Sequence, residues 1–188
     1  MVSVMSLWLP ILVSTVFVFI ASNLIWMVLQ LHKNDWKQLP DEDALRTALN
    51  SQDLKPDEYQ FPYSSGPADW KSEAWQAKFK EGPVGFLTLM PKGEMSMGKN
   101  MLFWFIYVVV IQVFIAYLTG IARPAGTGFM EVFQVAGATG VLGFAGACGP
   151  EAIWMGRQWS NVMKNIFDGI VYGLISAATF AWLWPAAL

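Results

Sequence analysis

The sequence predicts an all-α membrane protein: a four-helix transmembrane bundle with a small α+β insert between the first and second spans. Charged residues make up 14% of the 188 residues, against about 25% in ordinary soluble domains. Of these charged residues, 20 lie within residues 32–100, and only six lie in the remaining 119. The hydrophobic fraction of 55% excludes a disordered chain. An apolar chain with one polar segment is typical of an integral membrane protein with one water-exposed part.

Four apolar stretches come close to the ~20 residues that a helix needs to cross a bilayer, namely 7–31, 101–121, 128–148 and 166–184. The first stretch has no basic residue before it and no small-residue cleavage site, so we interpret it as a span and not as a signal peptide. The chain then divides into a first span at 1–31, the insert at 32–100 and three further spans at 101–188.

Basic residues near the span ends predict the orientation, because Lys and Arg concentrate on the cytoplasmic side of the membrane. One side carries six of them, and the other side carries only Arg123. The six are Lys33, Lys37, Lys92, Lys99, Arg157 and Lys164. We therefore expect the insert to be cytoplasmic and both termini to lie outside.

The insert is expected to alternate short helices and strands. Asp41 is placed to cap a first helix, and residues 59–63 alternate apolar and polar side chains as in an edge strand. Asp69 is expected to cap a second helix that stops at Gly82, and residues 84–90 alternate again as a second strand. A unit this small buries a marginal core, so we expect it to rest on the membrane or on a partner.

Small residues repeat every four positions along the last span, at Gly169, Gly173, Ala177 and Ala181, and the third span adds Gly140 and Gly143. Such ladders let two helix backbones approach closely in a membrane. Two interpretations stay open. The third and fourth spans pack as an antiparallel hairpin, which we favour because a short loop joins them, or one ladder receives another subunit.

An interfacial helix is expected near residues 151–164, after a helix break at Gly149-Pro150. Its tryptophans would face lipid, and Arg157 and Lys164 would face the headgroups.

The segment that ends at Lys99 nearly matches the phosphate-binding pattern GxxxxGK[ST], but Asn100 replaces the hydroxyl that would hold magnesium. We therefore do not expect a nucleotide site. Lys92 and Lys99 are instead candidates, with the two basic residues of the interfacial helix, for binding anionic lipid headgroups.

Four polar side chains fall within the apolar stretches: Gln112, Gln134, Glu131 and Asp168. The two glutamines are expected to hydrogen-bond each other across the second and third spans. Glu131 near Arg123, and Asp168 near Lys164, both lie in first helical turns, where the helix dipole favours an anion. We interpret these acids mainly as interface anchors, with a conduction or binding role as the alternative.

The composition excludes several kinds of binding and catalytic site. The single cysteine, Cys148, and the single histidine, His32, exclude a cysteine-based zinc site and a histidine cluster, and neither is given a role. A formal charge of −2 gives no basic surface for nucleic acid. We expect no metal, no cofactor and, because no catalytic groups converge, no enzyme activity.

Several short motifs, GPVGFLTLMPKG, MGKN, IWMGRQW, KNIFDGIVYGL and FAWLWP, resemble a group of small bacterial inner-membrane proteins without an assigned activity. The resemblance covers about residues 59–186. It implies a bacterial cytoplasmic membrane, and it brings no reaction, substrate or site residue.

Three functions follow as hypotheses. The first is an accessory or scaffolding membrane subunit that binds a protein partner or itself, with membrane lipids around it. The second is an oligomeric channel or transporter for a small solute that uses Asp168, Glu131 and the two glutamines. The third is a lipid- or quinone-binding protein that uses the aromatic and basic inner interface.

Overall fold

The structure is a computed structural model that describes residues 1–187, most of them helical. It consists of two compact units. The first, here called the helical unit, joins residues 1–35 to the part of the chain that begins at Ser96. The second unit is the insert, residues 36–95. These boundaries agree within a few residues with the predicted insert at 32–100.

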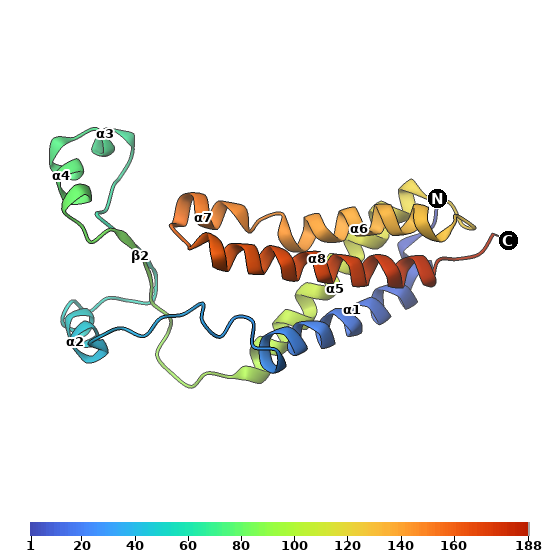
Figure 1. The fold of residues 1–188 in the computed structure, drawn as a ribbon, viewed down its shortest axis with the longest axis horizontal. Coiled ribbons are helices and arrows are strands. Elements are labelled where there is room, and N and C mark those ends of the chain that lie inside the picture. The colour runs from blue at the N-terminus through green and yellow to red at the C-terminus, as the bar shows by residue number, and fades with distance from the viewer. Residues whose placement is uncertain (188) are drawn as a thin grey trace. The chain divides into compact units, whose positions relative to one another are not determined.

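The helical unit contains all the long helices (Figure 1). The first span combines a 3-10 turn, an α-helix and a π-helical turn: η1 (Val4–Leu7), α1 (Trp8–Asn23) and η2 (Leu24–Val28). The remaining helices are α5 (Met97–Ala122), α6 (Phe129–Ala145), α7 (Gly149–Met155) and α8 (Trp159–Trp182).

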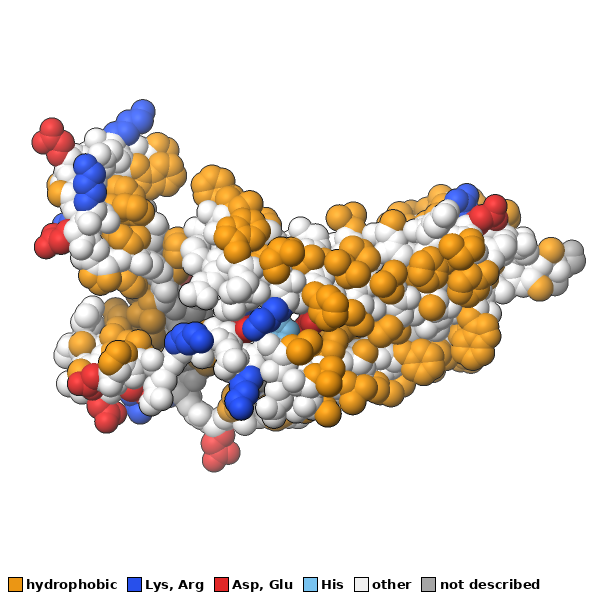
Figure 2. Space-filling model, viewed as in Figure 1, with side chains coloured by type: hydrophobic (Ala, Val, Ile, Leu, Met, Phe, Trp, Pro, Cys, Tyr) orange, Lys and Arg blue, Asp and Glu red, His pale blue; other side chains and the backbone are white. Residues whose placement is uncertain are grey.

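Three helical stretches are long and apolar enough to cross a membrane: Val4–Val28, Met97–Ala122 and Phe129–Met155. Fewer than a third of the residues in their most apolar windows are buried. Hydrophobic side chains gather over the helical unit, while charges concentrate on the insert (Figure 2). The protein is therefore an all-α membrane-type fold with a small sheet. Among the described helices, α8 does not belong to this set, so the structure identifies three of the four predicted spans by length and composition.

The core of the helical unit is the close antiparallel packing of α6 on α8. A Cβ atom at Gly140 would lie 2.9 Å from the Cα of Gly173, and one at Gly169 would lie 2.7 Å from the Cβ of Ala145. Only glycine permits so close an approach of two backbones. The small-residue ladders of these two helices therefore meet each other within one chain.

The first described residues and the segment after α8 lie at the same end of the helical unit (Figure 1). The Val2 amide donates to the carbonyl of Gly120 near the end of α5, at 2.9 Å. The Gly126 amide, in the loop between α5 and α6, donates to the carbonyl of Pro185 at 2.8 Å. The four long helical segments thus run alternately away from and toward this end.

The insert has the predicted mixture of helices and strands. Strand β1 (Glu58–Phe61) pairs antiparallel with β2 (Gly85–Thr88), and the helices are α2 (Glu42–Ser51), α3 (Pro67–Trp70) and α4 (Glu73–Glu81). Asp41 caps α2 as predicted, because its carboxylate accepts from the Ala44 amide at 2.9 Å. None of residues 36–95 is buried.

Two predicted helix starts are wrong. The cap of α4 is Ser72, whose hydroxyl accepts from the Trp75 amide, while the Asp69 carboxylate accepts from Ser65 inside a tighter local turn. Residues 151–164 do not form one interfacial helix either, because Gly156 adopts a left-handed conformation with φ 66° that ends α7. Pro150 starts α7 and does not break a helix, since proline is tolerated in a first turn.

Candidate functional site

His32 lies between two carboxylates. Its Nδ1 atom is 2.7 Å from Oδ2 of Asp35, and its Nε2 atom is 3.0 Å from Oδ2 of Asp168. The side chain is almost completely enclosed, since only 4% of the residue's surface is exposed. This arrangement joins the segment after the first span to α8, although Asp168 and His32 are 136 positions apart in the chain.

The end of the first span turns His32 toward α8. In η2 the hydrogen bonds run over five residues, as from the Leu29 amide to the Leu24 carbonyl, and Gln30 then reverses the chain with a positive φ of 51°. The Trp26 ring stacks on the His32 ring with centroids 3.9 Å apart and planes 3° apart. The Trp26 indole also donates to Oδ2 of Asp168 at 3.0 Å. π-Helical turns often occur at functional sites, where they re-aim side chains.

The other end of this arrangement is an ion pair between Asp35 and Lys164, whose Nζ lies 2.5 Å from Oδ1 of Asp35. Burial alone would raise the pKa of Asp35. The hydrogen bonds and charges of Lys164 and His32 outweigh it and hold this pKa below its ordinary value of 3.8. We call Trp26, His32, Asp35, Lys164 and Asp168 the His32 cluster.

Each ring nitrogen of His32 faces a carboxyl oxygen, one from Asp35 and one from Asp168. Lys164 places a positive charge beside Asp35. The His32 cluster thus gathers two acids, one lysine and one imidazole in an enclosed group.

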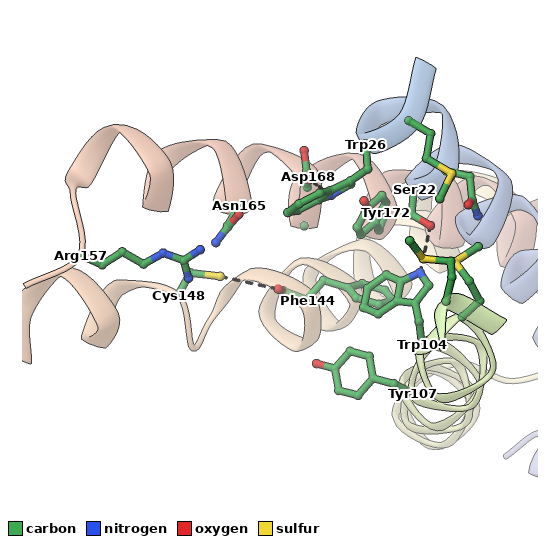
Figure 3. A pocket seen from close by; sticks show the side chains of 15 residues that line it. Ser22, Trp26, Trp104, Tyr107, Phe144, Cys148, Arg157, Asn165, Asp168 and Tyr172 are labelled. Carbon is green, nitrogen blue, oxygen red and sulfur yellow. Dashed lines mark hydrogen bonds between the residues drawn. The ribbon is translucent and has the colours of Figure 1, made fainter. Parts of the chain in front are cut away.

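A pocket of about 620 Å³ adjoins the His32 cluster within the helical unit (Figure 3). Aromatic and methionine side chains make up most of its wall, among them Trp26, Met101, Trp104, Tyr107, Phe144 and Tyr172. They come from η2, from the first half of α5, from the end of α6 and from the middle of α8. Polar contributions to the wall include Asp168, Arg157, Asn165 and Cys148.

Two buried polar atoms of the pocket wall have no hydrogen-bond partner among the described residues. They are Oδ1 of Asp168 and the hydroxyl of Tyr172, and each residue is only 4% exposed. Leaving such groups unpaired costs about 1–3 kcal/mol each, and more for charged groups. The pocket therefore combines apolar walls with polar atoms that lack a partner, which is typical of a small-molecule site.

The structure separates the predicted glutamine pair. Gln112 is fully buried and donates to the Ser176 hydroxyl on α8 at 2.8 Å, whereas Gln134 is exposed. The prediction of a Gln112–Gln134 bond is wrong because α5 presents Gln112 to α8, while Gln134 lies on an outer face of α6.

The two acids also have different surroundings. Glu131 is exposed, and Arg123 donates only to its backbone carbonyl, at 3.3 Å. Asp168 is buried, and its hydrogen-bond partners are His32 and Trp26, while the neighbouring Lys164 pairs with Asp35 instead. Because α6 and α8 are antiparallel, Glu131 and Asp168 lie toward opposite ends of the helical unit.

Two of the four residues predicted to bind lipid headgroups form ion pairs within the chain, and the other two are exposed. Lys164 pairs with Asp35 and Arg157 pairs with Glu151, so both are already neutralised within the chain. Lys92 and Lys99 are exposed, the first in the insert and the second at the start of α5, where it lies over the Phe103 ring.

The packing residues occupy neighbouring faces of the helices. Gly169, Gly173 and Ala177 on α8 face Ala145, Gly140 and Gly137 on α6, and Ala181 is buried in the same core. Gly143 differs, since a Cβ there would meet Ile111 on α5 at 3.2 Å.

Sequence reasoning missed His32 and Asp35. A usable signal is the stripe of polar residues on α8 at helical spacing: Asn161, Lys164, Asp168, Tyr172 and Ser176. A polar stripe on an apolar helix needs buried partners, and His32 with Asp35 is the polar pair next to a span end.

No protein family, curated protein or solved structure matches the chain in the comparisons made with it.

Proposed function

We propose that this protein is a multi-pass membrane protein that binds an amphipathic, lipid-like small molecule in the pocket beside the His32 cluster. The observation that carries the proposal is the pocket itself, about 620 Å³ in volume, with apolar walls and with Asp168 and Tyr172 as unpaired buried polar groups. Ligand sites commonly have volumes of about 300–1,000 Å³, apolar walls and a few polar groups that fix orientation.

The proposal includes α8 as a fourth span. Its support is the path of the chain: Val2 bonds Gly120, and Gly126 bonds Pro185, so the first described residues and the segment after α8 lie at one end of the helical unit. An even number of crossings produces this arrangement. The polar stripe of α8 lowers its hydropathy, but that stripe is turned inward, with Asp168, Ser176 and Thr179 all buried. A helix whose polar groups face its neighbours still presents an apolar surface to lipid.

We further propose that the membrane is a bacterial cytoplasmic membrane with the insert inside the cell. The support is the excess of Lys and Arg near the span ends on the insert side, and the resemblance of the motifs. An alkaline phosphatase fusion at the C-terminus is expected to be active, because the phosphatase folds outside the cytoplasm. An inactive fusion overturns this orientation.

The test of ligand binding is native mass spectrometry of the full chain purified in mild detergent. The wild-type protein is expected to keep a bound lipid-like mass. Cys148→Phe places a ring in the pocket wall and is expected to remove that mass. Leu142→Phe is the matched control, because Leu142 is 73% exposed on α6 and lies outside the pocket, so its bound mass should persist. Equal occupancy in both variants contradicts the proposal.

A second candidate function is the accessory or scaffolding subunit, and the insert favours it. None of residues 36–95 is buried, and large apolar side chains such as Trp36, Tyr63 and Met90 are exposed there. A unit with so little core gains stability from a partner. The same native spectra test this, since a monomer without any bound protein counts against the subunit role.

The channel alternative gains no support from the geometry. Asp168 is bonded within the His32 cluster, and Glu131 lies toward the opposite end of the helical unit. Nothing in the described residues links the two acids into one path.

A further inference from the structure

We infer that the pocket of the helical unit opens sideways between α5 and α6, and that its ligand enters from the lipid phase of the membrane. This inference rests on the proposed function and specifies the ligand: a molecule dissolved in the bilayer, whose apolar chain can extend out of the pocket into lipid. The other source of an amphipathic ligand is the water beside the membrane, which needs a different opening.

α5 and α6 pack together over only part of their length. A Cβ atom at Gly143 would lie 3.2 Å from Cγ2 of Ile111 on α5. About one turn farther along the chain, Gly146 and Ala147 are exposed. Apart from its chain neighbours, no described residue lies within 4 Å of a Cβ at Gly149. The two helices therefore separate beyond Ile111, toward the start of α5, as the ribbon also shows (Figure 1).

α5 stays against the first span over the same stretch. The Trp104 indole donates to the hydroxyl of Ser22 on α1 at 2.9 Å. The separation therefore leaves space between α5 and α6 rather than between α1 and α5. The pocket occupies this space, since Trp104 and Tyr107 line it from α5, and Phe144 and Cys148 line it from the end of α6.

Tyr107 brings the opening to the depth of the lipid chains. It lines the pocket, yet 46% of the residue is exposed, so the pocket reaches the surface there. Tyr107 follows Met97, the first residue of α5, by ten positions, which is about 15 Å along the helix. Both α5 and the stretch that contains α6 are long and apolar enough to cross a membrane. An opening about 15 Å from the end of such a helix meets lipid chains, because the apolar layer is about 30 Å thick.

The two sides of the pocket differ in chemistry. The wall residues from α5 carry neither a charge nor an amide group, and they are Met97, Met101, Trp104 and Tyr107. The polar side chains of Asn165 and Asp168 come from α8. A membrane amphiphile fits this arrangement with its polar group toward α8 and its chain toward α5 and the opening. A chain that passes through the opening stays in lipid, so the ligand need not fit wholly within 620 Å³.

The only cysteine of the chain, Cys148, lies in the pocket wall and serves as a reporter of the route of entry. The full chain is reconstituted into vesicles of phosphatidylethanolamine and phosphatidylglycerol. Two maleimides are compared: N-dodecylmaleimide, which dissolves in the bilayer, and a sulfonated maleimide, which dissolves in the water inside and outside the vesicles. Mass spectrometry of the intact chain measures the rate of modification, and unfolding in SDS provides the fully labelled reference. The lipid-soluble reagent is expected to react about tenfold or more faster, because its competitor's charge keeps it out of the apolar layer.

Tyr107→Ala removes a side chain from the rim of the opening. It is expected to raise the rate with N-dodecylmaleimide about threefold or more, which corresponds to a barrier lower by about 0.65 kcal/mol. Trp104 keeps its bond to Ser22, so the remaining wall stays in place. Tyr117→Ala is the matched control, because Tyr117 lies on the same helix, is 52% exposed and is not part of the pocket wall. Its rate should equal that of the wild-type protein.

Equal or faster modification by the sulfonated maleimide overturns the inference, because the pocket would then open to water. Failure of both reagents to modify the folded chain overturns it as well, and so does a rate that Tyr107→Ala leaves unchanged. The wild-type comparison needs no variant to fold. A wild-type native spectrum without a bound mass contradicts the proposed ligand binding instead, since the labelling rates test the opening and not the occupancy.

Discussion

The helical unit and the insert use polar residues in opposite ways. In the helical unit charges are few, yet His32 and Asp168 are buried and bonded across long stretches of chain. In the insert charges are many, and the polar contacts are local, such as Asp41 to the Ala44 amide and Ser72 to the Trp75 amide. The comparison teaches that polar residues determine tertiary structure where they are scarce, because an unpaired polar group is costly only where water is absent.

The largest expected effect comes from His32→Ala in the helical unit. The change removes the ring partner of both Asp35 and Asp168 and the ring on which Trp26 stacks. Leaving an enclosed polar group unsatisfied costs about 1–3 kcal/mol, and more for a charged group, and here two carboxyl groups lose a partner. The measurement is the free energy of unfolding by SDS titration in mild detergent. Asp41→Ala, the matched change in the insert, removes only a helix cap, worth about 1 kcal/mol, and should not affect the helical unit. Equal losses for both variants contradict the comparison.

A smaller loss is expected from Gly173→Leu. A Cβ at Gly173 lies 2.6 Å from the backbone nitrogen of Val141, which cannot move aside without separating α6 from α8. Overpacking of this kind costs about 1–3 kcal/mol, and it should lower the thermal midpoint followed by circular dichroism. Gly66→Leu in the insert is the control, because nothing lies within 4 Å of a Cβ there. An unchanged midpoint for Gly173→Leu means that the ladder does not hold the helical unit together.

Acidification is expected to weaken the helical unit through Asp35. Because the pKa of Asp35 is lowered in the folded protein, its contribution is complete above the ordinary value of 3.8 and is lost as the pH falls through the lowered value. The loss is expected only at pH values below about 3.8, where the ordinary carboxyl group takes up its proton. Asp35→Asn should remove this part of the pH dependence in thermal unfolding measured from about pH 7 downward. A variant with the same pH profile as the wild-type protein excludes Asp35 as its source.

The smallest effect is expected from Gln112→Leu together with Ser176→Ala. Their bond joins α5 to α8 at 2.8 Å, and hydrogen bonds between membrane helices average about 0.6 kcal/mol. A double-mutant cycle on SDS unfolding measures this coupling. The exposed Gln134→Leu is the control and should show no coupling with Ser176→Ala.

Local features of the fold could be predicted from the sequence. The cap at Asp41, the two strands of the insert, the stop of α4 at Gly82 and the small-residue ladders all depend on spacing within one element. The positions of the apolar stretches followed from composition alone. These features are accessible because neighbouring residues determine them.

The candidate site could not be predicted in the same way. His32 and Asp168 meet only because a π-helical turn and the positive φ of Gln30 redirect the chain after the first span. The spacing of polar residues on α8 reveals that partners are needed, but not which residues supply them. Gln112 illustrates the same limit, because choosing Ser176 over Gln134 depends on how the helices are rotated.

The distance along the chain between His32 and Asp168 has a consequence for biosynthesis. Chains are made from the N-terminus at about 5–20 residues per second, so roughly 7 to 27 seconds separate the synthesis of His32 from that of Asp168, 136 residues later. During that interval His32 and Asp35 wait at the end of the first span without their partners on α8. In a chain that stalls before α8, His32 and Asp35 still contact each other, but His32 lacks Asp168 and Asp35 lacks Lys164. Such an unfinished protein exposes polar groups that the finished one encloses.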